Sequence, residues 1–287
     1  MSSEIFVKNK GNSNIQIVAL GGQGELGKNM YVVEVDQKMF VLDAGLMFPE
    51  DEMLGIDAVI PDVSYLLENK HKLQGIFISH GHEDHIGALA YLLDYIDVPV
   101  YGSKLSIELI KIKLKEAKFK GKVKFIEIDN KTLLNFDGTI ITFFKTNPSI
   151  PGSYGICIET DQGSIVYTGD FKFDQGASPL YAADLGKMAK IGQKGVLMLL
   201  SDSVGAETPG YLMSEMMIEE NMRNVFHSSE GRVIIASFAS NINTIQHTMN
   251  AAYKSNRKVA IVGNEIRQIT ELTIQSGFLH VEEDVII

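Results

Sequence analysis

The sequence contains a single cysteine, Cys157, among 287 residues. One cysteine excludes an internal disulfide framework and is typical of proteins in a reducing compartment, so we expect a cytoplasmic protein. Cys157 lies in an alternating pattern of the kind found in strands, and we expect it in the core.

Positive charge is scarce, because the chain has 26 Lys and Arg but 36 Asp and Glu, which gives a formal net charge of −10. That sign excludes a protein that coats nucleic acid nonspecifically with its whole surface. No hydrophobic run approaches the length of a membrane span, and residues 1–14 contain no apolar signal-peptide core, so we expect neither export nor membrane insertion. The 45% of hydrophobic residues suffices for a substantial core in one large domain or two smaller ones.

Three of the seven histidines fall within one six-residue stretch, HGHEDH at residues 80–85. The residues before it, 74–79, are apolar and β-branched and predict a buried strand, whereas residues 86–93 predict a helix. The stretch is therefore a strand-to-helix turn. Its density of imidazoles and carboxylates indicates a metal site rather than a polar loop, because the pattern HxHxDH rarely arises by chance.

The spacing within this turn suggests two metal ions. His80 and His82 are two residues apart at the strand end, so they can point the same way and bind one ion. Asp84 and His85, on the first helical turn, can face a second ion, and Glu83 is expected to point elsewhere. Imidazole and carboxylate ligands suit Zn, and equally Mn or Fe, so the spacing does not choose the metal.

The longer motif HGHEDHIGAL resembles the signature of the metallo-β-lactamase fold. Four further segments are similar to the ribonuclease J family of bacterial RNA-degrading enzymes: GGQGELGKNM at 21–30, LDAG at 42–45, PEDEMLG at 49–55 and YTGDFKFD at 167–174. The resemblance covers nearly the whole chain. It implies a metallo-β-lactamase αββα four-layer sandwich followed by part of a β-CASP α/β domain.

This resemblance also implies roles for particular residues. Asp170 would bridge the two metal ions through its two carboxylate oxygens, and Asp84 would orient the attacking hydroxide, so both are predicted to be catalytic. Asp43 would fix the geometry of the ligands without binding the metal itself. Loss of such a supporting partner costs about 10- to 100-fold in metal affinity or activity. The metal ligands implied in this way are His80, His82, Asp84, His85 and Asp170. A turn aspartate at 43 and a helix-capping aspartate at 170 are the simpler alternatives.

The pattern of strands fits this architecture. Strands are predicted at 15–20, 31–35, 39–42 and 98–101, and from residue 123 onward the pattern is all strand, at 123–128, 139–144, 153–159 and 164–167. We interpret the later group as a second sheet. Two sheets packed face to face, with helices outside, give the four-layer sandwich, for which we assign residues 1–194.

From residue 195 the pattern changes to alternating strands and helices, as in a parallel sheet. The predicted elements are strands 195–200, 232–237 and 258–262 and helices 211–227, 241–255 and 265–276. We interpret residues 195–287 as a β-CASP-like domain that is apparently truncated. The chain would then be either a fragment of a longer protein or the product of a shortened gene.

Two segments of this domain resemble characteristic β-CASP segments, and both follow predicted strands, where ligands of such sheets bind. The predicted substrate-binding residues are Ser201, Asp202, Ser203, Phe238, Ser240 and Asn241. Ser and Asn can donate to phosphate, and Phe238 can stack on a base, which contributes about 1 to 3 kcal/mol in single-strand binders. Ordinary helix N-caps are the alternative interpretation of both segments.

Two other features allow two interpretations. The glycine-rich turn at 21–24 is able to cradle phosphate, but its spacing favours tight backbone packing beside the site. The only strongly basic stretch contains seven lysines, Lys111, Lys113, Lys115, Lys118, Lys120, Lys122 and Lys124. It would either steer RNA or form a solvated helix face that balances an acidic body.

The chain departs from the ribonuclease J pattern at residues 146–151, TNPSIP. Family members have a metal-ligating His in the segment Thr-x-His-Ser-x-Pro, whereas Pro148 occupies that position here. Proline has no ligand atom and no backbone N–H. The first metal site would therefore be incomplete.

The resemblance implies a metal-dependent RNA phosphodiester hydrolase of RNA processing and decay, which uses Zn or Mn and has RNA as its partner. Exonuclease and endonuclease activity both remain open, and a homo-oligomer or a hetero-oligomer with a ribonuclease J paralogue is expected. Pro148 favours an alternative, a noncatalytic RNA-binding or scaffold subunit that pairs with an intact paralogue. The β-CASP-like segment argues against a small-molecule hydrolase such as a thioesterase or lactonase.

We expect the substitution Pro148→His to raise metal affinity by at least about tenfold, because a direct ligand should matter no less than a supporting partner. Competitive titration of Zn or Mn against a chromophoric chelator measures this change. Pro148→Ala is the control, because removing proline relaxes the loop whether or not a ligand is gained. Equal affinities of the His and Ala variants would show that residue 148 does not reach the metal.

Overall fold

The computed structural model describes residues 3–7, 12–146, 149–174 and 181–287. The chain divides into two compact units. The first contains the residues up to Thr146 together with Gly152–Phe171 and Asp184–Val204, and the second contains the others. Asn147 and Pro148 lie outside the described residues, so the predicted loss of a ligand at position 148 stays a prediction.

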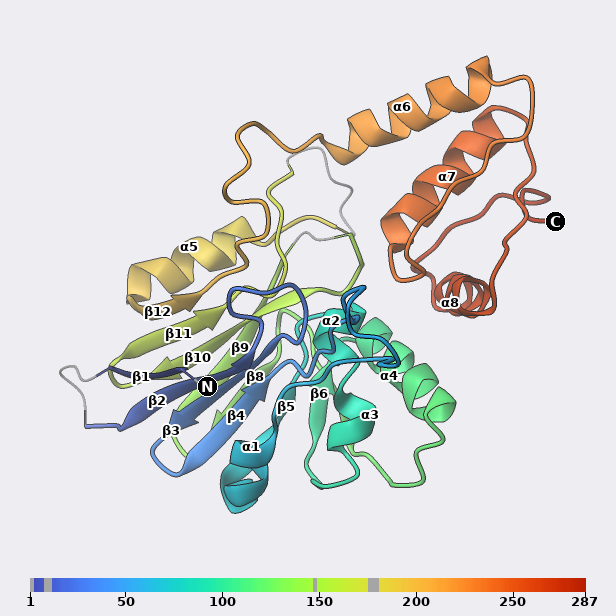
Figure 1. The fold of residues 1–287 in the computed structure, drawn as a ribbon. Coiled ribbons are helices and arrows are strands. Elements are labelled where there is room, and N and C mark those ends of the chain that lie inside the picture. The colour runs from blue at the N-terminus through green and yellow to red at the C-terminus, as the bar shows by residue number, and fades with distance from the viewer. Residues whose placement is uncertain (1–2, 8–11, 147–148, 175–180) are drawn as a thin grey trace. The chain divides into compact units, whose positions relative to one another are not determined.

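The first unit contains a seven-stranded sheet in which the strands follow one another in chain order (Figure 1). Its strands are β1 (Ser3–Val7), β2 (Ile15–Gly21), β3 (Met30–Val35), β4 (Lys38–Leu42), β5 (Leu73–Phe77), β6 (Val100–Gly102) and β7 (Phe125–Glu127). The pairs from β1 to β4 are antiparallel and those from β4 to β7 are parallel. The parallel strands β4 and β5 therefore end at the same edge of the sheet.

A five-stranded sheet forms the other half of this unit, in the order β12-β11-β10-β9-β8. Its strands are β8 (Leu133–Phe136), β9 (Thr139–Lys145), β10 (Tyr154–Thr160), β11 (Gly163–Tyr167) and β12 (Val196–Leu200). Only the pair β11 and β12 is parallel within this sheet. As a result β11 and β12 also end at a common edge.

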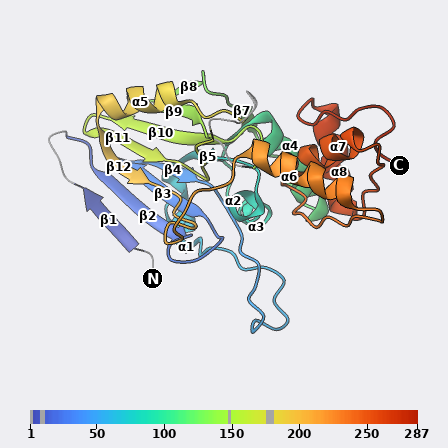
Figure 2. The ribbon, with the colours of Figure 1, turned by 90° about the horizontal axis from the view of Figure 1, so that it is seen from above.

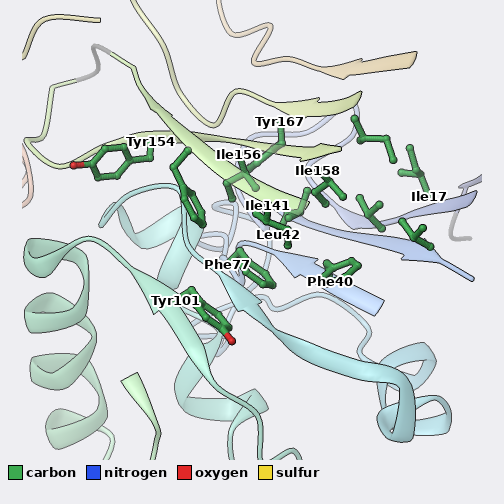
Figure 3. Packing of buried hydrophobic residues seen from close by; sticks show 14 of the residues in the cluster. Ile17, Phe40, Leu42, Phe77, Tyr101, Ile141, Tyr154, Ile156, Ile158 and Tyr167 are labelled. Carbon is green, nitrogen blue, oxygen red and sulfur yellow. The ribbon is translucent and has the colours of Figure 1, made fainter. Parts of the chain in front are cut away.

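The core lies between the two sheets and is rich in aromatic rings (Figure 3). Phe40 and Phe77 from the seven-stranded sheet and Phe143 from the five-stranded sheet are fully buried. Phe77 stacks on Tyr101 with the ring centroids 4.5 Å apart and the planes 3° from parallel. Gly75 leaves room for that tyrosine, because a Cβ at position 75 would lie 2.6 Å from its ring.

Helices cover the outer faces of both sheets (Figures 1 and 2). On the side of the seven-stranded sheet lie α1 (Ser64–Glu68), the 3-10 turn Lys70–Lys72, α2 (Glu83–Ile86), α3 (Leu89–Leu92) and α4 (Lys104–Glu116). Helix α5 (Leu185–Lys194) covers the five-stranded sheet, where Ile191 packs against Phe144, Cys157 and Val166. This arrangement confirms the predicted four-layer αββα sandwich and the burial of Cys157. Within the part of the chain that the structure describes, no helix is long and apolar enough to cross a membrane.

Several details of the sequence-based prediction are wrong. Strand β7 pairs with β6 in the seven-stranded sheet, although we expected it to open the second sheet. Strand β12 pairs with β11 in the five-stranded sheet, although we expected it to open a separate parallel sheet. The division into domains of residues 1–194 and 195–287 stays a prediction. The helix predicted at 86–93 is two short helices, α2 and α3. Period and composition indicate that a segment is a strand, but they do not identify its neighbour.

The second unit contains three helices in its described residues: α6 (Glu215–Ser228), α7 (Ile242–Lys254) and α8 (Asn264–Gln275). Helix α6 packs against α7, and the buried His247 of α7 lies between Glu215 and Glu219 of α6, with N–O distances of 3.1 and 3.3 Å. The predicted parallel sheet is absent from the described residues of this unit. Residues 232–237 form no strand, and residues 258–262 form only the isolated bridge from Val259 to Ile286. A strand requires a hydrogen-bonded neighbour along its length, which neither segment has among the described residues.

The substitution Phe77→Ala should lower the free energy of unfolding by about 3–5 kcal/mol, because it leaves a cavity among tightly packed rings. Urea denaturation followed by circular dichroism measures the change. The control Tyr95→Ala removes a ring that is 65% exposed and should alter stability by about 0.5 kcal/mol or less. A similar loss in both variants would contradict the central position of Phe77.

Candidate metal centre

The turn that contains the histidine cluster is held by main-chain hydrogen bonds to the segment after β4 and to Asn29, which directly precedes β3. The amide of Ala44 donates to the carbonyl of His85 at 2.8 Å, and the amide of Asn29 donates to that of Asp84 at 3.1 Å. Gly45 lies so close that a Cβ there would be 1.6 Å from the Asp84 carbonyl oxygen. Only glycine fits at this contact, which explains the LDAG segment.

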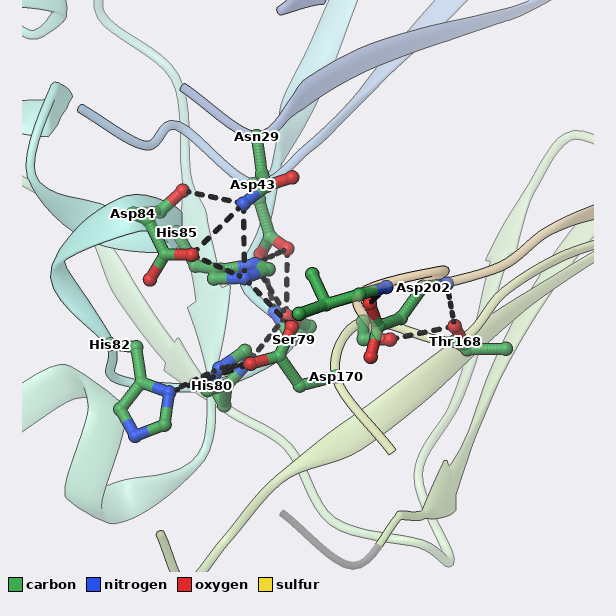
Figure 4. A network of polar contacts seen from close by, with 12 residues as sticks. Asn29, Asp43, Ser79, His80, His82, Asp84, His85, Thr168, Asp170 and Asp202 are labelled. Carbon is green, nitrogen blue, oxygen red and sulfur yellow. Dashed lines mark hydrogen bonds and ion pairs between the residues drawn. The ribbon is translucent and has the colours of Figure 1, made fainter. Parts of the chain in front are cut away.

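Asp170, which follows β11, lies among three imidazoles (Figure 4). Its Oδ2 is 3.3 Å from His80 Nε2 and 3.6 Å from His82 Nδ1, whereas its Oδ1 is 3.2 Å from His85 Nε2. The two oxygens of one carboxylate thus face different histidines. Gly169 permits this approach, because it has φ +55° and a Cβ there would lie 2.7 Å from Ser79 Cβ.

Asp84 borders the same group of side chains. Its Oδ2 is 3.4 Å from His85 Nε2 and accepts a hydrogen bond from the side-chain amide of Asn29 at 3.2 Å. Glu83 points elsewhere, as expected, and forms an ion pair with Lys113 at 3.0 Å. Adjacent carboxylates of the same turn therefore have different surroundings.

Asp43 lies behind the histidines and is fully buried. It accepts hydrogen bonds from the backbone amide and hydroxyl of Ser79 and from the hydroxyl of Tyr167, each at 2.7 Å. The Nδ1 of His85 is also 2.7 Å from Asp43 Oδ2. A carboxylate that holds Nδ1 of a histidine turns Nε2 of that ring outward, here toward Asp170.

The electrostatics of the site favour positive charge between the carboxylates. Burial opposes the charged form of His85, but Asp43 and Asp170 outweigh it and raise the pKa of His85 well above its usual value. Burial also opposes ionisation of Asp170, but His80 and His85 outweigh it and hold the pKa of this carboxyl well below its usual range. Burial lowers the pKa of His80, and the neighbouring His85 adds to that effect.

The donor atoms fit a metal ion. His80, His85 and Asp170 each offer one ligand atom, and these atoms lie within 4.8 Å of one another. Imidazole nitrogen and carboxylate oxygen are the ligands of Zn and Mn sites. His82 and Asp84 lie at the border of this group, so the structure brings all five predicted ligands together.

The first of the two predicted substrate-binding segments follows β12, at the edge where β11 also ends. The amide of Asp202 donates to Thr168 Oγ1 at 3.1 Å, and the amide of Thr168 donates to the Leu200 carbonyl at 3.0 Å. Burial and the nearby Asp170 raise the pKa of Asp202. The neighbours of Asp202, Ser201 and Ser203, are exposed.

The second segment, which contains Phe238, Ser240 and Asn241, lies in the second unit. Phe238 is 78% exposed, so its predicted role in stacking on a base stays a prediction. Asn241 precedes α7 and its side chain accepts a hydrogen bond from the Thr244 amide at 3.0 Å. Asn241 is therefore the N-cap of α7, which is the alternative interpretation of this segment, and the bond occupies its side-chain oxygen.

Three residues of the site received no role from the sequence: Asn29, Ser79 and Tyr167. Asn29 lies in the segment GGQGELGKNM and Tyr167 begins YTGDFKFD, so the resemblance included both without indicating their contacts. Ser79 directly precedes the histidine cluster. The glycine-rich turn shows the tight packing we favoured, because a Cβ at Gly21 would lie 2.2 Å from the Lys28 carbonyl oxygen.

Two family models match the chain. Residues 24–197 match the metallo-beta-lactamase superfamily, and residues 230–287 match the beta-CASP domain of ribonuclease J. Over the whole chain, the fold is similar to the crystal structure of a protein of unknown function from Enterococcus faecalis V583. That match has a TM-score of 0.68 and 14% identity over 96% of this chain and 73% of the other, which shows the fold alone.

Curated relatives agree with the family models. Ribonuclease J 2 of Staphylococcus saprophyticus and Ribonuclease J 2 of Staphylococcus aureus are each 51% identical to this chain over 278 residues. These alignments cover 97% of this chain and 50% of each relative, so the chain spans about half the length of the relatives it matches. The chain belongs to the metallo-beta-lactamase superfamily and, within it, to the ribonuclease J family.

Proposed function

We propose that this chain hydrolyses RNA phosphodiester bonds with bound metal ions, as a ribonuclease of the ribonuclease J type in RNA processing and decay. The observation that supports this most directly is the position of Asp170, whose two oxygens face different imidazoles at 3.2 and 3.3 Å. A carboxylate in that position suits a bridge between two ions. The similarity to proteins named ribonuclease J 2 supports RNA as the substrate.

The residues divide into two ligand groups around Asp170. His80 and His82 would hold one ion and Asp84 and His85 the other, with Zn as the expected metal and Mn as its alternative. Bound ions supply Lewis acidity at the phosphoryl oxygens and lower the pKa of water.

The protein's own residues orient the reacting groups. Asp43 fixes the ring of His85 through Nδ1, and three hydrogen bonds from Ser79 and Tyr167 fix Asp43 in turn. The amide of Asn29 holds one oxygen of Asp84. Asp84 is 42% exposed, so its carboxylate is available to orient the attacking water.

We also propose which residues contact RNA, how the chain divides into domains and where it acts. RNA would contact Ser201, Asp202 and Ser203 in the first unit and Phe238, Ser240 and Asn241 in the second. The two domains would be residues 1–194 and 195–287, and the chain would act in the cytoplasm as a homo-oligomer or with a ribonuclease J paralogue. The arrangement favours neither exonuclease nor endonuclease cleavage.

The residue at position 148 favours a second candidate function. Pro148 replaces the histidine of the family pattern, which suits a noncatalytic RNA-binding or scaffold subunit that pairs with an intact paralogue. Such a subunit would bind RNA without cleaving it. Metal content and RNA cleavage, measured on one preparation, separate the two functions.

Asp170→Asn and Asp84→Asn should each lower metal-dependent RNA cleavage at least about 100-fold, because each removes a charge from the group that surrounds the metal. Glu83→Gln is the matched control, since this carboxylate belongs to the same turn but pairs with Lys113. The assay follows end-labelled RNA on gels with added Zn or Mn. Cleavage that survives in Asp170→Asn would contradict the proposal, and binding without cleavage in the unsubstituted chain would favour the scaffold function.

Asp43→Asn should weaken metal binding by about 10- to 100-fold, because the amide no longer accepts the Nδ1–H of His85 as a charged partner does. Tyr167→Phe removes only one of the hydrogen bonds to Asp43 and should have a smaller effect. Competition for Zn against a chromophoric chelator gives both affinities without any RNA. An unchanged affinity in Asp43→Asn would show that this carboxylate does not support the ligands.

A further inference from the structure

The chain passes from the first unit to the second between Phe171 and Lys172, directly after the predicted ligand Asp170. On the side of the first unit, the amide of Asp202 donates to Thr168 Oγ1 at 3.1 Å (Figure 4). The carboxylate of Asp202 accepts a hydrogen bond from the backbone amide of Phe171. The backbone that bears Asp170 is therefore held by the first unit up to residue 171.

The next residue, Lys172, is held by the residues at the start of α6. Its Nζ forms an ion pair with Glu215 Oε1 at 2.7 Å and donates to the Met213 carbonyl at 3.0 Å. The amide of Glu215 donates to Asp174 Oδ2 at 2.8 Å. Adjacent residues are thus fixed to different units, and consecutive Cα atoms are only about 3.8 Å apart. A displacement of Glu215 would therefore be transmitted to the backbone beside Asp170.

Glu215 is itself held firmly within the second unit. Its Oε2 accepts a hydrogen bond from the side-chain amide of Asn243 and lies 3.1 Å from His247 Nε2. The contact with His247 holds the pKa of Glu215 below its usual value although burial opposes this, and Lys172 adds to the effect. The side chains of Glu215 and Lys172 are each only 18% exposed, so water screens their ion pair less than it screens a surface pair.

Helix stability explains part of this network. A carboxylate in the first turn of α6 interacts favourably with the helix dipole, and the contact with His247 joins α6 to α7. Glu219, one turn further along α6, also joins the two helices, since it lies 3.3 Å from His247 Nδ1 and pairs with Lys254 at 2.7 Å. Of these two glutamates, only Glu215 contacts Lys172 within the described part of the chain.

We propose that Glu215 is a positioning residue for the metal centre, which acts through Lys172 to set the position of Asp170. This inference rests on the proposed function in that Asp170 binds the metal ions. Functional groups of a site must be held within about 0.5 Å of their productive positions. The two oxygens of Asp170 face different imidazoles at 3.2 and 3.3 Å, so a shift of its backbone would disturb both contacts at once. Metal affinity would then depend on an ion pair in the unit that contains the second predicted RNA-binding segment.

The test uses two substitutions that change the net charge in opposite directions. Glu215→Gln removes a negative charge and Lys172→Met a positive one, so a purely electrostatic effect on a cation would lower metal affinity in the first and raise it in the second. Loss of position lowers the affinity in both. We expect a loss of three- to tenfold, because a residue that contacts a ligand directly is worth about 10- to 100-fold. Competition for Zn against a chromophoric chelator measures the affinities.

Glu219→Gln is the matched control, because it alters the same helix, the same charge and the same histidine without removing a contact to Lys172. It should retain the metal affinity of the unsubstituted chain, and thermal unfolding followed by circular dichroism shows whether the variants fold alike. Lys172→Arg keeps the ion pair and should also retain the affinity. The double variant Glu215→Gln/Lys172→Met should lose no more affinity than either single variant, because both substitutions break the same pair.

Opposite changes of affinity in Glu215→Gln and Lys172→Met would show a purely electrostatic effect and would overturn the inference, as would an unchanged affinity in both. An equal loss in Glu219→Gln would assign the effect to the stability of α6 and would overturn it too.

This measurement needs no RNA cleavage. The expected pattern of affinities in a chain that binds Zn but leaves RNA intact would support the positioning role and contradict the proposed hydrolase. Normal cleavage together with an unchanged affinity in both variants would contradict the positioning role alone. A chain that binds no Zn would contradict both.

Discussion

The buried hydrogen bond between Asp43 and His85 is the interaction on which the candidate metal centre depends. One carboxylate with no exposed surface joins the ends of β4, β5 and β11 to α2, the helix that contains Asp84 and His85, through Ser79, Tyr167 and His85. A buried charge of this kind is stable only when its partners are all in place. The ligand geometry is therefore a property of the folded sandwich and not of the histidine turn alone.

The arrangement of the sheets explains why these strand ends meet. Parallel pairing places the ends of β4 and β5 together in one sheet and those of β11 and β12 together in the other. Packing around Phe77 and Phe143 holds the two sheets face to face. Glycines at 45 and 169 then allow the backbone after β4 and the residues after β11 to approach the histidine turn, where any Cβ would collide.

The sequence predicted the ligands that are close along the chain and, through the family resemblance, those that are distant. His80, His82, Asp84 and His85 lie within six residues, so their spacing alone indicated a metal site. Asp170 is far from them in the sequence, and only the resemblance placed it there. The contacts of Asn29 and Tyr167 could not be predicted, because a hydrogen bond across two sheets leaves no periodic signal in the sequence.

The sequence by itself determined the αββα architecture, most strand positions and the histidine turn, because hydrophobic period and short motifs are local properties. Only the tertiary structure decided that β7 belongs with β6 and β12 with β11, and that residues 232–237 form no strand. It also decided that Asp43 supports His85 and that the two oxygens of Asp170 face different imidazoles. The reason is physical: the choice of a strand's neighbour and the direction of a buried carboxylate depend on residues that are distant in the chain and meet only when the sheets pack.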